Sequence, residues 1–183
     1  MYWTEKGSQN TDKTIALALE RARELNLRHL VVASHTGATA KKVLKSLSDG
    51  QELVCVTHHA GYPNPSEVEI TPETRQGLQE QGVKVLTTTH LLSGIESSMR
   101  AKFKGVYPTD IVAMALRLLG QGFKVCVEIS VMALDAGLIP YNEEVIVIGG
   151  TSQGADTACV ITPAHSNNFF DTVVKEIICM PRG

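Results

Sequence analysis

Short apolar runs rich in Val and Ile alternate with amphipathic segments along the chain, and this alternation limits the fold more than any other feature of the sequence. The runs predict six strands, at residues 29–33, 53–57, 83–87, 145–148, 158–162 and 176–180. Helical periodicity predicts helices at residues 11–26, 40–48, 73–81, 109–119 and 124–136. Strands that alternate with helices form a mostly parallel sheet with helices on both faces, so we expect an α/β fold.

The length of 183 residues is enough for one well-buried core and too short for a second domain of ordinary size, so residues 1–183 are expected to form a single domain. The link at residues 149–156 is shorter than the roughly twelve residues that a parallel crossover needs. The fifth strand should therefore run antiparallel to the fourth. Residues 124–136 alternate like a strand and also repeat like a helix, and their length favours a helix.

Charge and apolar content exclude several classes of partner. With 17 Lys and Arg against 19 Asp and Glu, the net charge of −2 provides no field that would recruit nucleic acid. No apolar run approaches the ~20 residues that cross a bilayer, and the first residues do not resemble a signal peptide. The four cysteines lie in apolar runs without CxxC spacing, as reduced core residues do. We expect a cytoplasmic protein with neither nucleic acid nor membrane as a partner.

The turn after the first strand is the strongest candidate binding site. It joins an apolar run to an amphipathic stretch and consists of Ser34, His35, Thr36, Gly37, Ala38 and Thr39. Free amides and the positive end of a helix dipole suit such a turn to a phosphate, and glycine admits close approach. The alternative is an ordinary helix cap, in which Ser34 or Thr36 satisfies the first turn.

Other polar residues gather where the predicted strands end, and we call this edge the rim. The carboxyl ends of parallel strands share one edge of a sheet, which is where ligands bind. The further candidates for a bound cofactor there are Thr57, His58, His59, Thr88, Thr89, His90, Ser93, Gly94, Gly150, Thr151, Gly154 and Asp156. Side chains of His58 and His59 point in opposite directions along a strand, so we expect hydrogen bonds to an anion and no metal.

Residues 91–107 are long for a connection between a strand and a helix. They carry Arg100, Lys102 and Lys104, which suggests a mobile cover that brings cations to a phosphorylated ligand; a solvated loop is the alternative. No P-loop, G-x-G-x-x-G or G-x-S-x-G motif is present. A triad of Ser34, His90 and Asp156 remains open, although nothing in the spacing recommends it.

Five segments carry a resemblance to a known family: VVASHTG from residue 31, VTHHAG from 56, QGFKVCVE from 121, GGTSQGADTA from 149 and TPAH from 162. The whole chain resembles the stand-alone family related to the C-terminal (alpha/beta) domain of pyruvate kinase. The resemblance implies a three-layer α/β/α sandwich with strand order 3-2-1-4-5, strand 5 antiparallel, and a sugar phosphate at the turn after strand 1. Pyruvate kinase activity is not expected, because the resemblance does not include the catalytic barrel.

The same turn is similar to the S-x-T-G-x-T phosphate loop of flavodoxins, which binds the phosphate of FMN. Flavodoxins flank the flavin ring with aromatic residues, and this chain offers Tyr62, Tyr107 and, if the N-terminus folds back, Trp3. We therefore expect a phosphate-bearing ligand, with FMN favoured. The alternatives are an effector module for a sugar phosphate without redox activity and a hydrolase that uses rim histidines. Whether the chain is an enzyme, and whether it forms a homo-oligomer, stay open.

Overall fold

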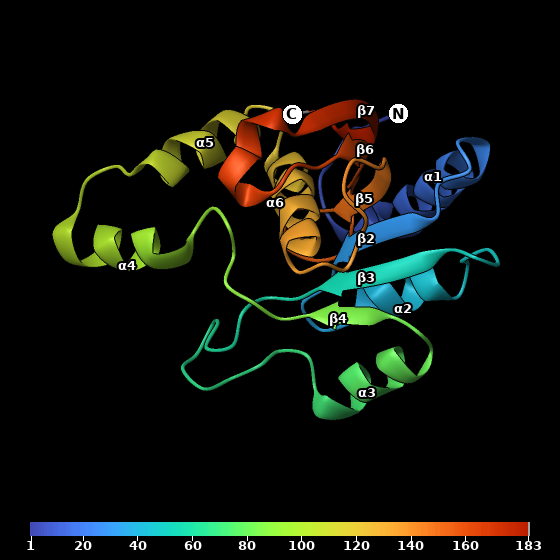
Figure 1. Ribbon diagram of the computed structural model, residues 1–183, viewed down its shortest axis with the longest axis horizontal. Coiled ribbons are helices and arrows are strands. Elements are labelled where there is room, and N and C mark those ends of the chain that lie inside the picture. The colour runs from blue at the N-terminus through green and yellow to red at the C-terminus, as the bar shows by residue number, and fades with distance from the viewer. Residues whose placement is uncertain (183) are drawn as a thin grey trace.

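The computed structural model describes residues 1–182 and contains one seven-stranded sheet with helices on both faces (Figure 1). The strands lie in the order β1-β7-β6-β5-β2-β3-β4. Their bounds are β1 Tyr2–Trp3, β2 His29–Ala33, β3 Glu52–Val56, β4 Lys84–Leu86, β5 Val145–Gly149, β6 Thr157–Thr162 and β7 Val173–Pro181. All six predicted strands are present, and β1 is a seventh that the sequence did not indicate.

The predicted strand order is confirmed for five strands, which appear here as β4-β3-β2-β5-β6. Strand β2 pairs in parallel with β3 and β5, with Val32 opposite Cys55 on one side and Ile148 on the other. Strand β6 pairs antiparallel with β5, as the short link predicts. The sheet then differs in detail from that order, because β7 and β1 extend it beyond β6 and bring the N- and C-termini together (Figure 1).

Each predicted helix is present, with small differences at the ends. The helices are α1 Thr11–Glu24, α2 Ala38–Leu44, α3 Pro72–Glu80, α4 Gly94–Phe103, α5 Pro108–Arg117 and α6 Gln121–Asp135, with short 3₁₀ segments at Ser8–Asn10 and Ser166–Asp171. The ambiguous stretch at residues 124–136 is helical and lies in α6. None of the helices in residues 1–182 has the length and apolar character needed to cross a membrane.

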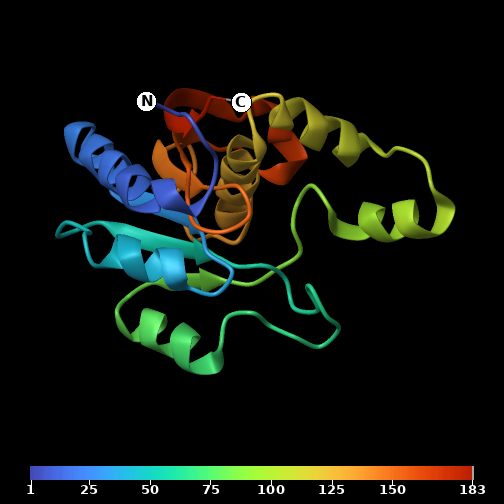
Figure 2. The same cartoon turned by 180° about the vertical axis from the view of Figure 1, so that it is seen from behind.

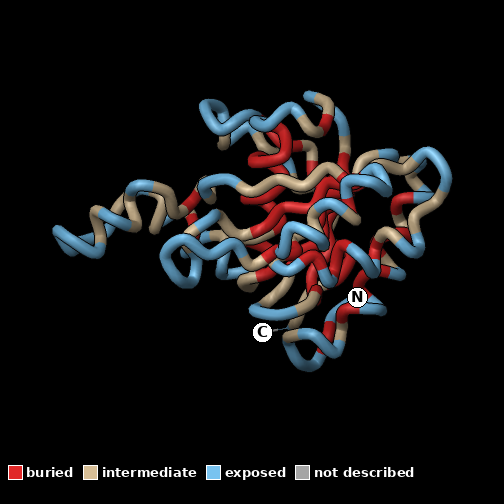
Figure 3. Tube along the Cα trace, turned by 90° about the horizontal axis from the view of Figure 1, so that it is seen from below, coloured by how far each residue is buried: buried red, intermediate tan, exposed pale blue. Residues whose placement is uncertain are grey.

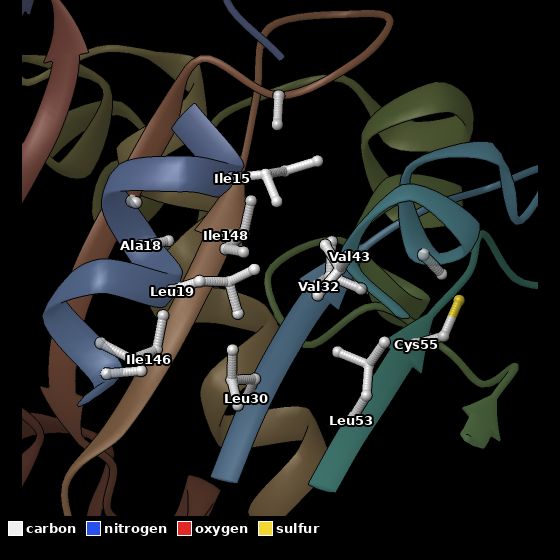
Figure 4. Packing of buried hydrophobic residues seen from close by; sticks show 14 of the residues in the cluster. Ile15, Ala18, Leu19, Leu30, Val32, Val43, Leu53, Cys55, Ile146 and Ile148 are labelled. Atoms are coloured by element: carbon white, nitrogen blue, oxygen red, sulfur yellow. The ribbon is translucent and has the colours of Figure 1, made fainter. Parts of the chain in front are cut away.

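The apolar strands are buried on both faces because alternate side chains pack against different helices. Leu30 and Val32 belong to a cluster that α1, α2 and α3 cover, and Ile15 and Leu19 of α1 pack into it (Figure 4). Val31 points the other way, into a second cluster with α6. The buried residues lie at the centre of the molecule (Figure 3). The near-continuous hydrophobicity of these strands is the expected pattern for the middle of three layers.

Residues 91–107, predicted to be a mobile cover or a solvated loop, instead contain the helix α4. Its acidic Glu96 in the first turn and its basic Arg100 and Lys102 in the last turn both favour a helix through the helix dipole. The helix does not cover the rim. It extends away from the sheet in both opposite views (Figures 1 and 2). We call residues 91–119, which include α4 and α5, the arm.

Candidate functional site

The turn after β2 begins with a helix cap. Ser34 is buried, and its Oγ accepts hydrogen bonds from the amides of Thr39 at 3.1 Å and Ala40 at 3.2 Å. The Gly37 amide donates to the Ser34 carbonyl, which closes the turn before α2 begins at Ala38. Ser34 therefore fills the capping role that the alternative interpretation of this turn gave it.

Gly37 is required by packing as well as by backbone conformation. Its φ of +83° lies in the left-handed region that favours glycine. A Cβ atom at this position would lie 2.7 Å from Thr74 Cγ2 and 3.3 Å from Leu78 Cδ1, both on α3. A side chain at position 37 would thus collide with α3. The contact with α3 and the positive φ together explain why glycine is needed here, without any ligand.

Three amides of the turn remain available for an anion. In the part of the chain that the structure describes, the amides of His35, Thr36 and Ala38 donate no hydrogen bond to another residue. Thr36 and Ala38 are exposed, and His35 is half-buried. Free amides at and just before the start of a helix carry a partial positive charge that suits a phosphate.

Aromatic rings surround this turn on the side of β3 and β4. The His35 ring stacks on the His58 ring at a centroid distance of 5.0 Å and an interplanar angle of 9°. Tyr62 meets the edge of His58 at 4.7 Å. His90 lies 5.6 Å from His58 and 6.1 Å from His59. The tertiary structure thus brings the predicted histidines from three strand ends into one aromatic cluster.

Glu69 joins two of these histidines. One carboxylate oxygen of Glu69 is hydrogen bonded to Nδ1 of His58, and the other lies 3.9 Å from Nε2 of His35. This pairing fixes the orientation of the His58 ring and leaves Nε2 of His58 available for other contacts. The carboxylate also adds negative charge beside the turn.

His90 lies deeper than the other rim histidines. Burial lowers the pKa of His90 below its ordinary value of 6.5, and the nearby carboxylate of Glu128 partly opposes this shift. Nε2 of His90 lies 3.2 Å from the carbonyl oxygen of Thr57. Glu128 is itself buried on α6, where it pairs with Lys124 at 2.5 Å and accepts a hydrogen bond from the Leu92 amide.

The remaining predicted residues after β3 and β4 have mixed environments. Thr57 is buried, and its Oγ1 lies 2.6 Å from Oγ1 of Thr87, so it connects the two strand ends. Thr88 and Thr89 are exposed beside the histidines in sequence. Ser93 and Gly94 lie at the start of α4, at the root of the arm. Only Thr88 and Thr89 of this group offer exposed side chains at the rim.

The loop after β5 packs against the N-terminal segment. The fully buried carboxylate of Asp156 accepts hydrogen bonds from the amides of Gly7 at 2.9 Å and Thr151 at 3.2 Å, and from the Thr157 hydroxyl at 2.8 Å. Gly154 lies against Thr11, where a Cβ atom would come within 2.3 Å of its hydroxyl. Asp156 therefore stabilises this loop.

Gly150 has a similar packing role, because a Cβ atom on it would lie 2.5 Å from the Gly154 carbonyl oxygen. The suggested triad is not formed in the described residues. Ser34 Oγ accepts two helix amides, His90 faces a backbone carbonyl, and Asp156 is bonded to the N-terminal segment.

Of the three aromatic residues suggested to flank a flavin, one lies beside the histidine cluster and two lie elsewhere. Tyr62 is 49 % exposed and contacts the histidine cluster. The N-terminus does fold back, but Trp3 is buried in the core and its indole N–H donates to the Asp156 carbonyl at 2.6 Å. Tyr107 lies at the start of α5, on the arm.

Sequence reasoning missed two parts of the site. Nothing in the spacing around Glu69 distinguishes it from an ordinary loop carboxylate, because its histidine partners lie 34 and 11 positions away. The buried pair of Lys124 and Glu128 had a visible signal. Opposite charges four residues apart, in an otherwise apolar helix, indicate an internal ion pair.

Residues 1–182 contain no group of three or more His, Cys, Asp and Glu side chains placed to hold a metal ion. Two surface grooves of about 410 and 430 Å³ lie between α1 and α2 and between α2 and α3. Neither is lined by a predicted site residue. The candidate site of amides and rings at the rim lies outside both grooves.

The layers, the strand order and the turn after β2 define a doubly wound α/β domain of the kind that binds ligands at the carboxyl ends of its strands. The model of the pyruvate kinase alpha/beta domain family matches residues 12–161, and the chain belongs to this family.

Solved structures similar to this chain include pyruvate kinases of Cryptosporidium parvum. One, in complex with ADP, is 18 % identical with a TM-score of 0.40, and the match covers 91 % of this chain and 23 % of that one. Another is 19 % identical with a TM-score of 0.39, covering 76 % and 20 % of the two chains. The chain thus spans less than a quarter of the length of these pyruvate kinases.

Proposed function

We propose that the chain binds a phosphate-bearing small molecule at the rim, with FMN as the favoured ligand. The observation that carries the proposal is that a turn with three available amides lies directly beside an aromatic cluster, since His35 of the turn stacks on His58 at 5.0 Å. The amides suit a phosphate, and the rings suit a flat aromatic group. A sugar phosphate would use only the first of these features.

The residues present fit FMN in two respects. The phosphate would rest on the amides of His35, Thr36 and Ala38, and the isoalloxazine ring would pack near Tyr62 and His58. Bound FMN would supply redox chemistry at that ring. The chain itself would bind the phosphate and orient the flavin.

Ligand-induced stabilisation tests this proposal. FMN at a hundred times its dissociation constant stabilises the fold by about 2.7 kcal/mol, which raises the melting temperature by about 5–10 °C for a domain of this size. Riboflavin, which lacks the phosphate, should give a much smaller shift. A bound flavin would also colour the purified protein yellow. A shift with glucose 6-phosphate and none with FMN would favour the sugar-phosphate effector module instead.

Thr36→Glu provides a matched test of the turn. It places a negative charge among the three amides, on a residue that is already exposed, so the extra shift of FMN over riboflavin should be lost. Thr4→Glu makes the same charge change at another exposed threonine and should leave that extra shift intact. Equal shifts with FMN and riboflavin in the natural sequence, or an undiminished FMN shift in Thr36→Glu, would reject phosphate binding at this turn.

Hydrolysis of a phosphate ester is a second candidate, which the pairing of His58 with Glu69 favours. A carboxylate on Nδ1 holds a histidine so that Nε2 can accept or donate a proton. If this function is correct, His58→Asn should reduce release of phosphate from FMN by about 100-fold or more. His165→Asn is the control, because His165 also pairs with a carboxylate, that of Asp135, beyond the opposite end of the sheet. Equal rates in both variants would exclude this role.

A cytoplasmic location also belongs to the proposal. Cys55, Cys126, Cys159 and Cys179 are all free and buried, as is usual in a reducing compartment. Fractionation of cells that produce the chain would test this, and recovery from an oxidising compartment would contradict it.

A further inference from the structure

The arm at residues 91–119 carries an unusual amount of exposed apolar surface. Half of the fourteen exposed large apolar residues in the described chain belong to it. Six of them are at least 62 % exposed: Ile95, Phe103, Val106, Ile111, Met114 and Leu118. Large exposed apolar patches mark interaction sites in soluble proteins.

Helix α4 lacks the packing that a short helix needs. It has ten residues and none of them is buried. Its first amide, that of Gly94, donates to the His90 carbonyl, and its side chains are linked to the start of α5 through Arg100 with Asp110 and Glu96 with Thr109. An isolated helix shorter than about 12–15 residues is marginal in water, so α4 requires a further surface to pack against. The views from the front, from behind and from below show it standing away from the body of the protein (Figures 1, 2 and 3).

Helix α5 is apolar on two faces, and its own chain covers only one of them. Ala113 is buried and Leu116 packs against the cluster under α6. On the other side, Ile111, Met114 and Leu118 recur at positions i, i+3 and i+7 and form an exposed stripe. Ala115 lies in the same stripe and is also exposed.

We propose that a second copy of this chain covers the arm, with α5 packed antiparallel against α5 of the partner across a two-fold axis near Met114 and Ala115. The dipole of α5 favours this arrangement, because antiparallel pairing places the start of each helix beside the end of the partner helix. A two-fold contact uses the same patch twice, which requires a self-complementary surface such as this stripe.

The exposed apolar surface of the arm is also large enough for a stable dimer interface. A standard interface takes about 800 Å² from each partner, and six large apolar side chains that are mostly exposed supply an area of that order. The two α4 helices would pack beside the paired α5 helices, which would bury Ile95 and Phe103 and give α4 the packing that it lacks. The inference concerns assembly and is independent of the ligand at the rim.

Light scattering coupled to size-exclusion chromatography tests the proposal with the full chain. The natural protein should have twice the monomer mass of 19.8 kDa at about 100 µM. The double variant Met114→Lys, Leu118→Lys should raise the dissociation constant of the dimer by about 100-fold or more, because two charges replace the centre of the contact. Both side chains are exposed, so the monomer should fold, which circular dichroism checks.

Phe170→Lys is the matched control, because Phe170 is 85 % exposed and lies outside the arm. It should remain a dimer. A natural protein that is monomeric at about 100 µM, or a dimer that survives the double variant, would overturn the proposal. Equal dissociation in Phe170→Lys would overturn it as well.

A cross-linking experiment tests the two-fold axis itself. Ala115→Cys should form a disulfide with its own equivalent under mild oxidation, since a residue beside a two-fold axis lies near the same residue of the partner. Phe170→Cys should not. The four natural cysteines are buried and should not compete. Cross-linking of Ala115→Cys that is no greater than that of Phe170→Cys would reject the antiparallel contact.

Discussion

Gly37 lies so close to Thr74 that a Cβ atom on the glycine would come within 2.7 Å of Thr74 Cγ2. The turn after β2 thus packs closely against helix α3 because Gly37 has no side chain. This contact also limits how the turn can be studied by mutation, because a change at Gly37 affects folding before it affects any ligand.

We predict that Gly37→Ala destabilises the protein by about 2–4 kcal/mol, from the left-handed φ of +83° and from the contact with Thr74 together. Urea unfolding without ligand measures this loss. In a Thr74→Ser background, which removes Cγ2, the same glycine substitution should cost about 1–2 kcal/mol, the part due to the backbone and to the remaining contact with Leu78. An equal cost in both backgrounds would show that the contact with Thr74 does not matter.

Asp156→Ala should reduce the free energy of unfolding by about 3 kcal/mol or more, because it leaves the half-buried amides of Gly7 and Thr151 and the buried Thr157 hydroxyl without their acceptor. Asp171→Ala is the control, since Asp171 is exposed, and it should change stability by less than about 0.5 kcal/mol. Chemical denaturation of the three proteins measures both values. Similar stabilities of the two variants would contradict a structural role for Asp156.

His90 should titrate below the ordinary histidine pKa of 6.5, because burial disfavours its charged form. Since the unfolded chain then binds the proton more readily than the folded one, this group contributes stability above pH 6.5 that is lost as the pH falls through 6.5 toward its folded pKa. NMR titration, with His90→Gln to assign the signal, measures the pKa. The variant should also lose less stability than the natural protein over this range. A His90 signal that titrates at or above pH 6.5 would contradict the prediction.

The cysteines should be inert in the folded protein. Burial raises the pKa of Cys55 to about 12 and that of Cys179 to about 11, so at pH 8 only roughly one Cys55 thiol in 10⁴ is ionised. We expect no reaction with a water-soluble disulfide reagent at pH 8 under native conditions. All four thiols should react after unfolding in urea. Fast labelling of the native protein would show that these side chains are more accessible than their packing indicates.

Local patterns were sufficient to predict most of the fold. The residues of α6 repeat with helical periodicity over a length that no strand in this sheet reaches, so length resolved an ambiguous pattern. The antiparallel direction of β6 followed from the short link at residues 149–156, because chain length limits how far a connection can travel. Residues 91–107 were predicted to be a mobile cover or a solvated loop, since α4 has few apolar residues and no buried side that would produce a periodic pattern.

The candidate site was predictable only in part. Histidines at three strand ends could be placed on one rim because parallel strands end at the same edge of a sheet. The contact of His58 with Glu69 could not be predicted, since it joins two positions within an irregular connection. The position of Asp156 among the polar residues after β5 predicted a ligand-binding residue. Only its hydrogen bonds with the amides of Gly7 and Thr151 show that it stabilises the loop.

The sequence by itself determined the α/β class, the antiparallel direction of β6 and the turn between Ser34 and Thr39, because periodicity, connection length and turn chemistry act over short distances along the chain. The order of five strands was implied by the family resemblance. Only the tertiary structure decided how those parts meet. It turned Gly37 toward α3, stacked His35 on His58 and left one face of α5 without a partner. These relationships join residues far apart in the sequence, and packing in three dimensions sets them.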